Sequence, residues 1–266
     1  MNRRIAAMSA AGAAVGAAGL VAAILIGFPA EETEAPSLTG VTAETGYKVC
    51  LKAAEPLFDS NAAADGRCYA RPELAALFNA PVLGAGRASA SVKMSPPDDT
   101  PSQADAAPSR TCNDYLTARR DGWFALASAD QRREAYFIRA CGALSLLLEA
   151  APAEESYFDG GSPAPEEMLA FHREGRFAIG EPVDVPAADV VMTGRDGGQW
   201  TFRLGEQAAA VEEIANADFD ADGIEEILVF VRIAPLGGTA AFYESGLLHK
   251  DGPAAPLTFQ PFDFGR

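Results

Sequence analysis

The spacing of apolar residues divides the sequence into a helical part and a part built from strands. Between residues 111 and 175, apolar side chains recur every three or four positions, which is the spacing of one face of an α-helix. Thr111 and Asp114 form a capping-box pattern, and apolar residues follow at helical spacing through Gly122 to Leu126. The pattern therefore predicts a first helix from Thr111 to Leu126.

Two further helices are predicted downstream. Ser128 with Gln131 begins the second helix, which ends before Pro152 and carries one apolar stripe made of Phe137, Cys141, Leu144 and Leu148. The third helix takes Ser162 as its N-cap and Pro163 as its first residue, and it ends at Gly175. Its apolar face consists of Met168, Leu169 and Phe171.

An alternating pattern replaces the helical one by Val190. Residues 190–193 and 199–204 flank the glycine-rich segment 194–198, which predicts a β-hairpin with Trp200, Phe202 and Leu204 on one face. The nearly continuous apolar run 227–233 predicts a central strand that is covered on both faces. Gly237 and Gly238 then turn the chain into an antiparallel neighbour at 239–244.

The N-terminus carries the longest uncharged segment. Arg3 and Arg4 precede the run from Ile5 to Phe28, which as a helix reaches about 36 Å and can cross the roughly 30 Å hydrocarbon core of a bilayer. Positive charge before the run predicts a cytoplasmic tail at 1–4, a transmembrane anchor at 5–28 and an extracytoplasmic remainder. A cleaved signal peptide is the alternative, and it would leave the domain periplasmic or secreted.

Four cysteines follow this segment, namely Cys50, Cys68, Cys112 and Cys141. An even number outside the cytoplasm predicts two disulfides, for which sequence alone allows three pairings. The midpoint between Cys112 and Cys141 falls on the break between the first two helices, so an antiparallel helix hairpin would bring them level. The midpoint between Cys50 and Cys68 falls at the start of the turn-rich segment 59–66. We therefore predict the disulfides Cys50–Cys68 and Cys112–Cys141.

These elements predict an α+β protein in which disulfide-stapled helical hairpins pack on a small antiparallel β meander. Residues 29–43 form a linker, 44–175 a helical region and 176–266 an antiparallel β region, and 44–266 are of a length suited to one domain. Within the helical region, residues 95–110 contain no large apolar side chain. They cannot bury enough surface to offset their ordering entropy, which predicts a flexible loop.

Charge and motifs narrow the classes of function. The chain has a formal net charge of -16, which argues against a nucleic-acid partner, because phosphate binding depends on clustered lysine and arginine. Motifs of zinc peptidases, serine hydrolases and phosphate-binding glycine loops do not occur in the sequence. Of the two histidines, His172 is predicted to serve the C-terminus of the third helix, and His249 to be exposed in a turn.

One motif carries metal-binding chemistry. Residues 218–226 contain acidic side chains at alternate positions, then a glycine and a further acid. Such carboxylates on a tight loop can converge on a hard cation such as Ca²⁺, which takes six to eight oxygen ligands. With one backbone carbonyl added, the predicted calcium ligands are Asp218, Asp220, Asp222, Ile224 and Glu226. The alternative is an acidic turn in which Asp218 and Asp222 accept hydrogen bonds from backbone amides without a metal.

The motif is not an EF-hand, because Val229 stands at the twelfth position, where that loop needs an acid. It resembles the shorter Asp-x-Asp-x-Asp-Gly-x-x-Asp/Glu calcium loop between strands of integrin-type propeller repeats and of many exported bacterial proteins. The resemblance covers this loop alone and occurs once in the chain. It therefore implies a calcium site and not a propeller fold.

The sequence as a whole predicts an inner-membrane protein with its domain in the periplasm. We expect a non-catalytic module that binds an unidentified envelope protein, with calcium stabilising a β-hairpin loop. The alternative is a hydrolase of envelope polymers in which Glu225 or Glu226 acts with a second acid, and in which calcium supports the site.

Overall fold

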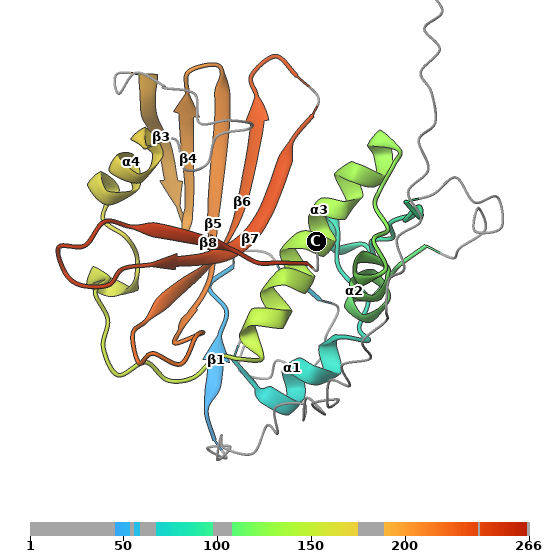
Figure 1. Ribbon diagram of the computed structural model, residues 1–266, viewed down its shortest axis with the longest axis horizontal. Coiled ribbons are helices and arrows are strands. Elements are labelled where there is room, and N and C mark those ends of the chain that lie inside the picture. The colour runs from blue at the N-terminus through green and yellow to red at the C-terminus, as the bar shows by residue number, and fades with distance from the viewer. Residues whose placement is uncertain are drawn as a thin grey trace, which may run out of the picture. The chain divides into compact units, whose positions relative to one another are not determined.

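A computed structural model describes residues 46–53, 56–58, 68–97, 108–174, 189–238 and 240–264 (Figure 1). The predicted cytoplasmic tail 1–4, transmembrane segment 5–28 and linker 29–43 lie outside these residues. Within the described ranges, no helix combines the length and the apolar character needed to cross a bilayer. Residues 44–266 form one compact unit.

The unit is built on an antiparallel meander of six strands, in which each strand pairs with the next along the chain. The strands are β3 (Val190–Asp196), β4 (Gln199–Leu204), β5 (Gln207–Ala217), β6 (Glu226–Pro235), β7 (Phe242–His249) and β8 (Thr258–Pro261). The predicted hairpin at its start is confirmed, although β3 runs on to Asp196 and the turn is only Gly197 and Gly198. Both glycines have positive φ, as tight hairpin turns require.

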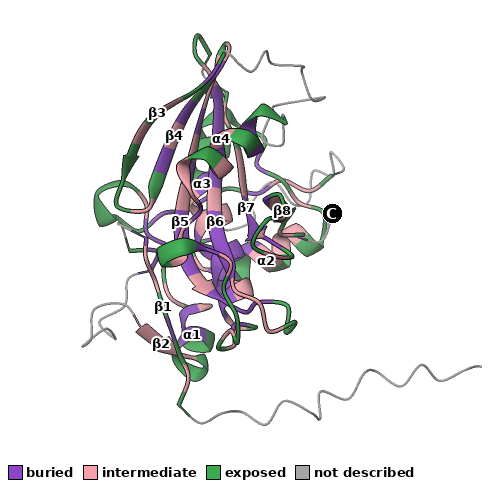
Figure 2. Ribbon diagram, turned by 90° about the vertical axis from the view of Figure 1, so that its left-hand side faces the viewer, coloured by how far each residue is buried: buried purple, intermediate pink, exposed green. Residues whose placement is uncertain are grey.

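The predicted central strand is β6, which pairs with β5 on one side and β7 on the other. Its successive side chains are buried on alternate faces of the sheet, and Figure 2 shows buried positions along its length. The predicted antiparallel neighbour is β7, which begins at Phe242 rather than at residue 239. Strands β5 and β8 complete the sheet without having been predicted from the sequence.

A second, two-stranded sheet pairs β1 (Lys48–Cys50) with β2 (Cys68–Ala70). Cys50 and Cys68 are directly opposite each other in its register, and the predicted disulfide between them is confirmed. The helical hairpin predicted around this disulfide is wrong, because both cysteines lie on extended backbone. After β1, the Lys52 N–H donates to the Ile214 carbonyl of β5. This segment therefore lies beside the end of β5, beyond the residues of β5 that pair with β4.

Four helices lie in the described residues: α1 (Arg71–Leu77), α2 (Cys112–Arg120), α3 (Ser128–Leu147) and α4 (Pro165–Arg173). The described residues also contain two short 3-10 helices, Ala85–Arg87 and Asp159–Gly161. The capping box of α2 is confirmed, since the Asp114 N–H donates to Thr111 Oγ1 over 3.2 Å. The helix ends at Arg120 and not at Leu126, because Gly122 takes a φ of 79° that breaks the helical path.

The second and third predicted helices are confirmed with shifted starts. The N-cap of α3 is Ala127, one residue before Ser128. Helix α4 begins at Pro165 rather than at Pro163, with Ala164 as its N-cap. Glu167 decides this start, because its carboxylate accepts a hydrogen bond from the Ala164 N–H at 2.9 Å. The predicted stop at Gly175 lies outside the described residues.

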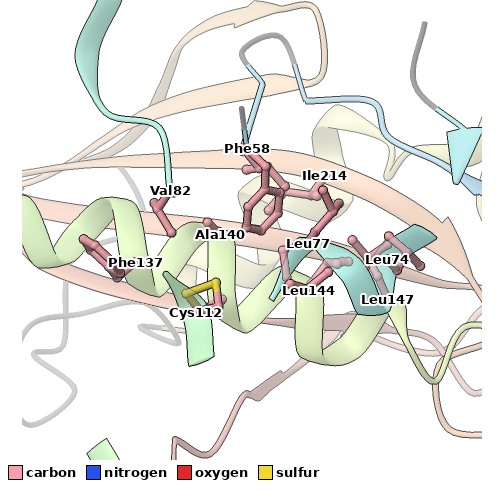
Figure 3. Packing of buried hydrophobic residues seen from close by; sticks show 14 of the residues in the cluster. Phe58, Leu74, Leu77, Val82, Cys112, Phe137, Ala140, Leu144, Leu147 and Ile214 are labelled. Carbon is pink, nitrogen blue, oxygen red and sulfur yellow. A yellow bond between two sulfur atoms is a disulfide. The ribbon is translucent and has the colours of Figure 1, made fainter. Parts of the chain in front are cut away.

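Each face of the large sheet has its own hydrophobic core. On one face, helix α3 packs against β7 and β6, and α1 and α2 pack against α3. Figure 3 shows Leu144 and Leu147 of α3 close to Leu74 and Leu77 of α1, with the Cys112–Cys141 disulfide, as predicted, in the same core. On the other face, Met168 and Phe171 of α4 join the inward side chains of β3 to β7, among them Trp200, Phe202, Val211 and Ile227.

The predicted loop 95–110 is held by pairing at both ends. Ser95 exchanges two backbone hydrogen bonds with Phe124, and Ser109 exchanges two with Val92. Residues 98–107 of the loop lie outside the described residues. The α+β class, the antiparallel sheet and both disulfides are therefore confirmed, while the helical region contains more extended backbone than the sequence indicated.

Candidate metal site

The acidic motif forms the connection between β5, which ends at Ala217, and β6, which begins at Glu226. A neighbouring segment holds this connection from one side. Asp218 and Ala151 exchange two backbone hydrogen bonds, and the Gly223 carbonyl accepts from the N–H groups of Glu154 and Glu155. The connection is thus fixed by tertiary pairing as well as by its own turns.

Within the connection, aspartate side chains accept hydrogen bonds from the backbone. The two carboxylate oxygens of Asp218 accept from the N–H groups of Ala221 at 2.7 Å and Gly223 at 2.9 Å. Asp222 Oδ1 accepts from the Ile224 N–H at 2.7 Å. These bonds stabilise a tight turn in which Ala221 and Gly223 have φ values of 66° and 87°. The backbone-capping arrangement considered as the alternative to a metal site is therefore present in the structure.

The same side chains also converge. One carboxylate oxygen from each of Asp218, Asp220 and Asp222 lies within 4.8 Å of the other two. Oxygens bound at 2.3 to 2.6 Å on opposite sides of a single Ca²⁺ are about 5 Å apart, so this spacing is compatible with one shared cation. Asp218 is buried, whereas Asp220 and Asp222 are exposed, so a cation could enter from solvent. These three residues can hold a metal ion.

Glu226 belongs to a second convergence, with His249. The register of β6 against β7 pairs Ile227 with Leu248, which brings the neighbouring side chains of Glu226 and His249 together. His249 Nδ1 lies 3.2 Å from Glu226 Oε1, and His249 Nε2 lies 2.6 Å from Asp251 Oδ1. The second oxygen of Glu226 accepts from the Phe219 N–H at 2.7 Å.

The prediction that His249 is exposed in a turn is wrong. Its side chain is 19% exposed, since β7 continues to His249 instead of ending in a turn before it. Ligand atoms of His249, Glu226 and Asp222 all lie within 4.8 Å of one another, which makes them a second group able to hold a metal ion. The sequence could have indicated this pairing only through the register of β6 against β7. Once Ile227 is paired with Leu248, the next residues outward, Glu226 and His249, lie opposite each other.

Burial and charge shift the acid–base behaviour of this pair. The pKa of the Glu226 carboxyl is raised to about 7, mainly by burial and also by the charges of Asp220 and Asp222. These effects outweigh the lowering effect of the hydrogen bonds with the Phe219 N–H and His249. Burial by itself would lower the pKa of the His249 imidazole. Hydrogen bonds to Asp251 and Glu226 outweigh that effect, so this pKa lies above its ordinary value.

No known protein family, curated protein or solved structure matches this chain. The functional argument therefore rests on the geometry of the described residues.

A polar cluster lies beside the acidic connection and involves Glu213 of β5. This carboxylate is 1% exposed and accepts hydrogen bonds from Trp200 Nε1 at 2.7 Å and Ser162 Oγ at 2.6 Å. Lys52 Nζ lies 3.7 Å from it. Glu225, which the sequence suggested as a catalytic acid or base, instead accepts hydrogen bonds from the side chains of Ser156 and Asn216. The bond from Ser156 ties the acidic connection to the segment before α4, and the bond from Asn216 ties it to β5.

The other histidine is part of the core. His172 was predicted to serve the C-terminus of its helix, but it is 1% exposed and its ring lies 3.9 Å, centre to centre, from the ring of Phe202. The prediction is wrong because the β3–β4 hairpin covers this face of α4. Burial lowers the pKa of His172 to about 3.

This burial predicts an acid-sensitive step in stability. The folded-state pKa of His172 lies below its unfolded value, so the stabilising effect of the neutral ring is complete above about pH 6.5 and is lost as the pH falls towards about 3. Between about pH 8 and pH 5 the loss is about 2 kcal/mol in the free energy of unfolding.

The matched variant is His172→Leu, whose side chain does not titrate. Urea unfolding of both proteins across this pH range should give a stability difference that changes by that amount. The opposite contributions of Glu226 and His249, which favour folding at the acid end, cancel in the difference. A difference that does not vary with pH would contradict the assignment.

Proposed function

We propose that this chain is a non-catalytic extracytoplasmic domain, tethered to the membrane by residues 5–28, in which calcium fixes the connection between β5 and β6. The observation that carries the calcium proposal is the convergence of Asp218, Asp220 and Asp222 within 4.8 Å. All of these donors are oxygens, which suits a hard cation. The Ile224 carbonyl and Glu226 are the further ligands that we propose for a complete calcium shell.

The charge of the connection supports a bound cation. Among the described residues, no lysine or arginine forms an ion pair with Asp218, Asp220 or Asp222. Backbone N–H groups supply only partial positive charge to these carboxylates, which therefore repel one another at short distance. A divalent cation would remove this repulsion and stabilise the folded state, to which it binds selectively.

The proposed location follows from the disulfides and the N-terminal segment together. Cys50–Cys68 and Cys112–Cys141 use all four cysteines of the chain, and such bonds persist in oxidising compartments such as the periplasm. Calcium in the millimolar range is also typical of the weak sites of extracellular modules. The partner in this proposal is an unidentified envelope protein, and the exposed side chains of Phe124 and Leu126 are candidates for contacting it.

Calcium titration of the detergent-solubilised full chain tests the metal. At a free calcium concentration of about 100 times the dissociation constant, we expect the free energy of unfolding to rise by about 2.7 kcal/mol. Asp220→Asn should abolish this rise, because it removes one of the three converging carboxylates. The variant should still fold, because Asp220 is exposed and the two backbone hydrogen bonds to Asp218 remain. Asp196→Asn, at the end of β3, is the control and should keep the full response.

A melting temperature that stays constant from chelator to millimolar calcium, with no heat of binding, would remove calcium from the proposal. Equal responses of wild type and Asp220→Asn would instead place the ion elsewhere.

The hydrolase alternative is favoured by one observation, the buried Glu226 carboxyl with a pKa near 7, which is the range of general acids. Against it, Glu226 is 1% exposed and both of its oxygens already have hydrogen-bond partners. A cavity of about 510 Å³ in the described residues is lined by Met94, Asn113, Thr117 and Trp123, and it does not include Glu226. Hydrolysis of envelope polymers by the full chain, lost in Glu226→Gln, would reverse our preference.

A further inference from the structure

We propose that His249, Glu226 and Asp222 form a second cation site, suited to Zn²⁺. The imidazole nitrogen and the two carboxylate oxygens lie within 4.8 Å of one another. This proposal goes beyond the calcium site, because it requires no calcium and adds the imidazole of His249, although Asp222 and Glu226 belong to both proposed ligand sets.

The spacing of two of the ligand atoms is compatible with zinc. Two ligands bound at 2.0 to 2.1 Å to a tetrahedral zinc ion are separated by about 3.3 Å. His249 Nδ1 and Glu226 Oε1 are 3.2 Å apart. The spacing of these two atoms is therefore compatible with both groups binding one zinc ion. Asp222, which is exposed on the turn, would supply the third ligand.

The orientation of the imidazole supports ligation through Nδ1. Asp251 Oδ1 lies 2.6 Å from Nε2 and can accept the proton of that nitrogen. In the tautomer that carries its proton on Nε2, the lone pair of Nδ1 is directed towards Glu226. Histidines that bind zinc commonly donate their other ring N–H to a carboxylate, which fixes the tautomer and the ring orientation.

The ligands are held by different elements that are fixed relative to one another. Glu226 begins β6, His249 ends β7, and the two strands are paired over their shared length. The Phe219 N–H holds the far oxygen of Glu226, so that the near oxygen faces the imidazole. Zinc would thus join the end of β7 to the β5–β6 connection, which no covalent link joins.

The donor set distinguishes this site from the calcium site. Imidazole nitrogen is a favourable ligand for zinc and for other borderline transition metals, whereas calcium takes oxygen ligands. With a neutral imidazole, the two carboxylates carry a charge that one divalent cation neutralises. Three protein ligands leave the fourth tetrahedral position to water. Asp222 could bridge both ions, since one carboxylate can serve two neighbouring metals.

The chain offers an unusually clear test, because it has only two histidines. We would follow the ring nitrogens by NMR in untagged, detergent-solubilised full chain labelled at histidine, while adding Zn²⁺ to the metal-free protein. One equivalent of zinc should shift the Nδ1 signal of His249. The His172 signals, from a ring 1% exposed in the other core, should stay in place and serve as the internal reference.

Variants separate this site from the calcium site. His249→Gln should lower zinc affinity at least tenfold, measured by equilibrium dialysis and metal analysis, while the calcium response is retained. Asp220→Asn should lose the calcium response and keep zinc. The zinc proposal is overturned if zinc leaves both histidine signals unchanged, or if His249→Gln, shown to be folded by its calcium response or its near-ultraviolet circular dichroism, binds zinc as wild type does. Loss of calcium binding alone would overturn the calcium site and leave the zinc site standing.

Discussion

Replacing Cys112 and Cys141 together by alanine is expected to lower the free energy of unfolding by about 3 to 4 kcal/mol. The disulfide closes a loop with a sequence separation of 29, so breaking it restores entropy to the unfolded chain. Both cysteines are fully buried, and the bond links the first residue of α2 to the middle of α3. Its loss therefore also loosens the core between these helices and the sheet.

Urea unfolding of the full chain, followed by tryptophan fluorescence, measures this effect. The matched comparison is the double alanine variant of Cys50 and Cys68, whose bond closes a shorter separation of 18 and joins half-exposed strands. We expect that variant to lose less stability than the first. A smaller loss at Cys112–Cys141 than at Cys50–Cys68 would show that the helical core does not depend on its disulfide.

Trp200→Ala is expected to lower the free energy of unfolding by about 3 to 5 kcal/mol, the range for truncating a large buried aromatic side chain. Trp200 is fully buried in the core between the sheet and α4, and Arg195 covers its ring at 4.1 Å. Its indole N–H donates to the buried Glu213 carboxylate, so truncation removes both packing and a charge-assisted hydrogen bond.

Trp200→Phe separates the two contributions, because it keeps an aromatic ring and removes the donor. We expect this variant to lose about 1 to 3 kcal/mol of stability, because the buried Glu213 carboxylate loses a hydrogen-bond donor. The remainder of the loss in Trp200→Ala is then due to packing. Chemical unfolding of the three proteins, followed by circular dichroism, tests this division. If the phenylalanine variant matches wild type, the hydrogen bond to Glu213 contributes nothing to stability.

Local patterns in the sequence predicted those elements whose apolar spacing is strong. The capping box at Thr111, the stripe of α3 and the alternation of Trp200, Phe202 and Leu204 each specify a structure without reference to distant residues. Strand β5 was not predicted, because its sequence is rich in alanine and carries two adjacent glutamates, which favour strands weakly. It is a strand because β4 and β6 pair with its two edges.

The candidate site shows the same division between local and distant information. The aspartates converge because they share one short connection, and alternate spacing in the sequence was sufficient to predict it. His249 contacts Glu226 only because of the register of β6 against β7, so neighbouring residues in the sequence could not predict its surroundings. The surroundings of the next residue, Lys250, also depend on contacts that are distant in the sequence. It is 2% exposed, and its ammonium group donates to Glu167 of α4, far away in the sequence.

The disulfide between β1 and β2 has a mechanical consequence for a protein pulled from its N-terminal side. Tension entering at residue 46 reaches Cys50 and passes through the sulfur bridge to Cys68, from which α1 follows after two residues. Leu51 and Lys52 lie after Cys50, inside the loop that the disulfide closes, so their backbone contacts with β5 do not carry this load. A sustained pull from the N-terminal side is thereby transmitted to β2 and α1, and the contacts of Leu51 and Lys52 with β5 are not the first to be loaded.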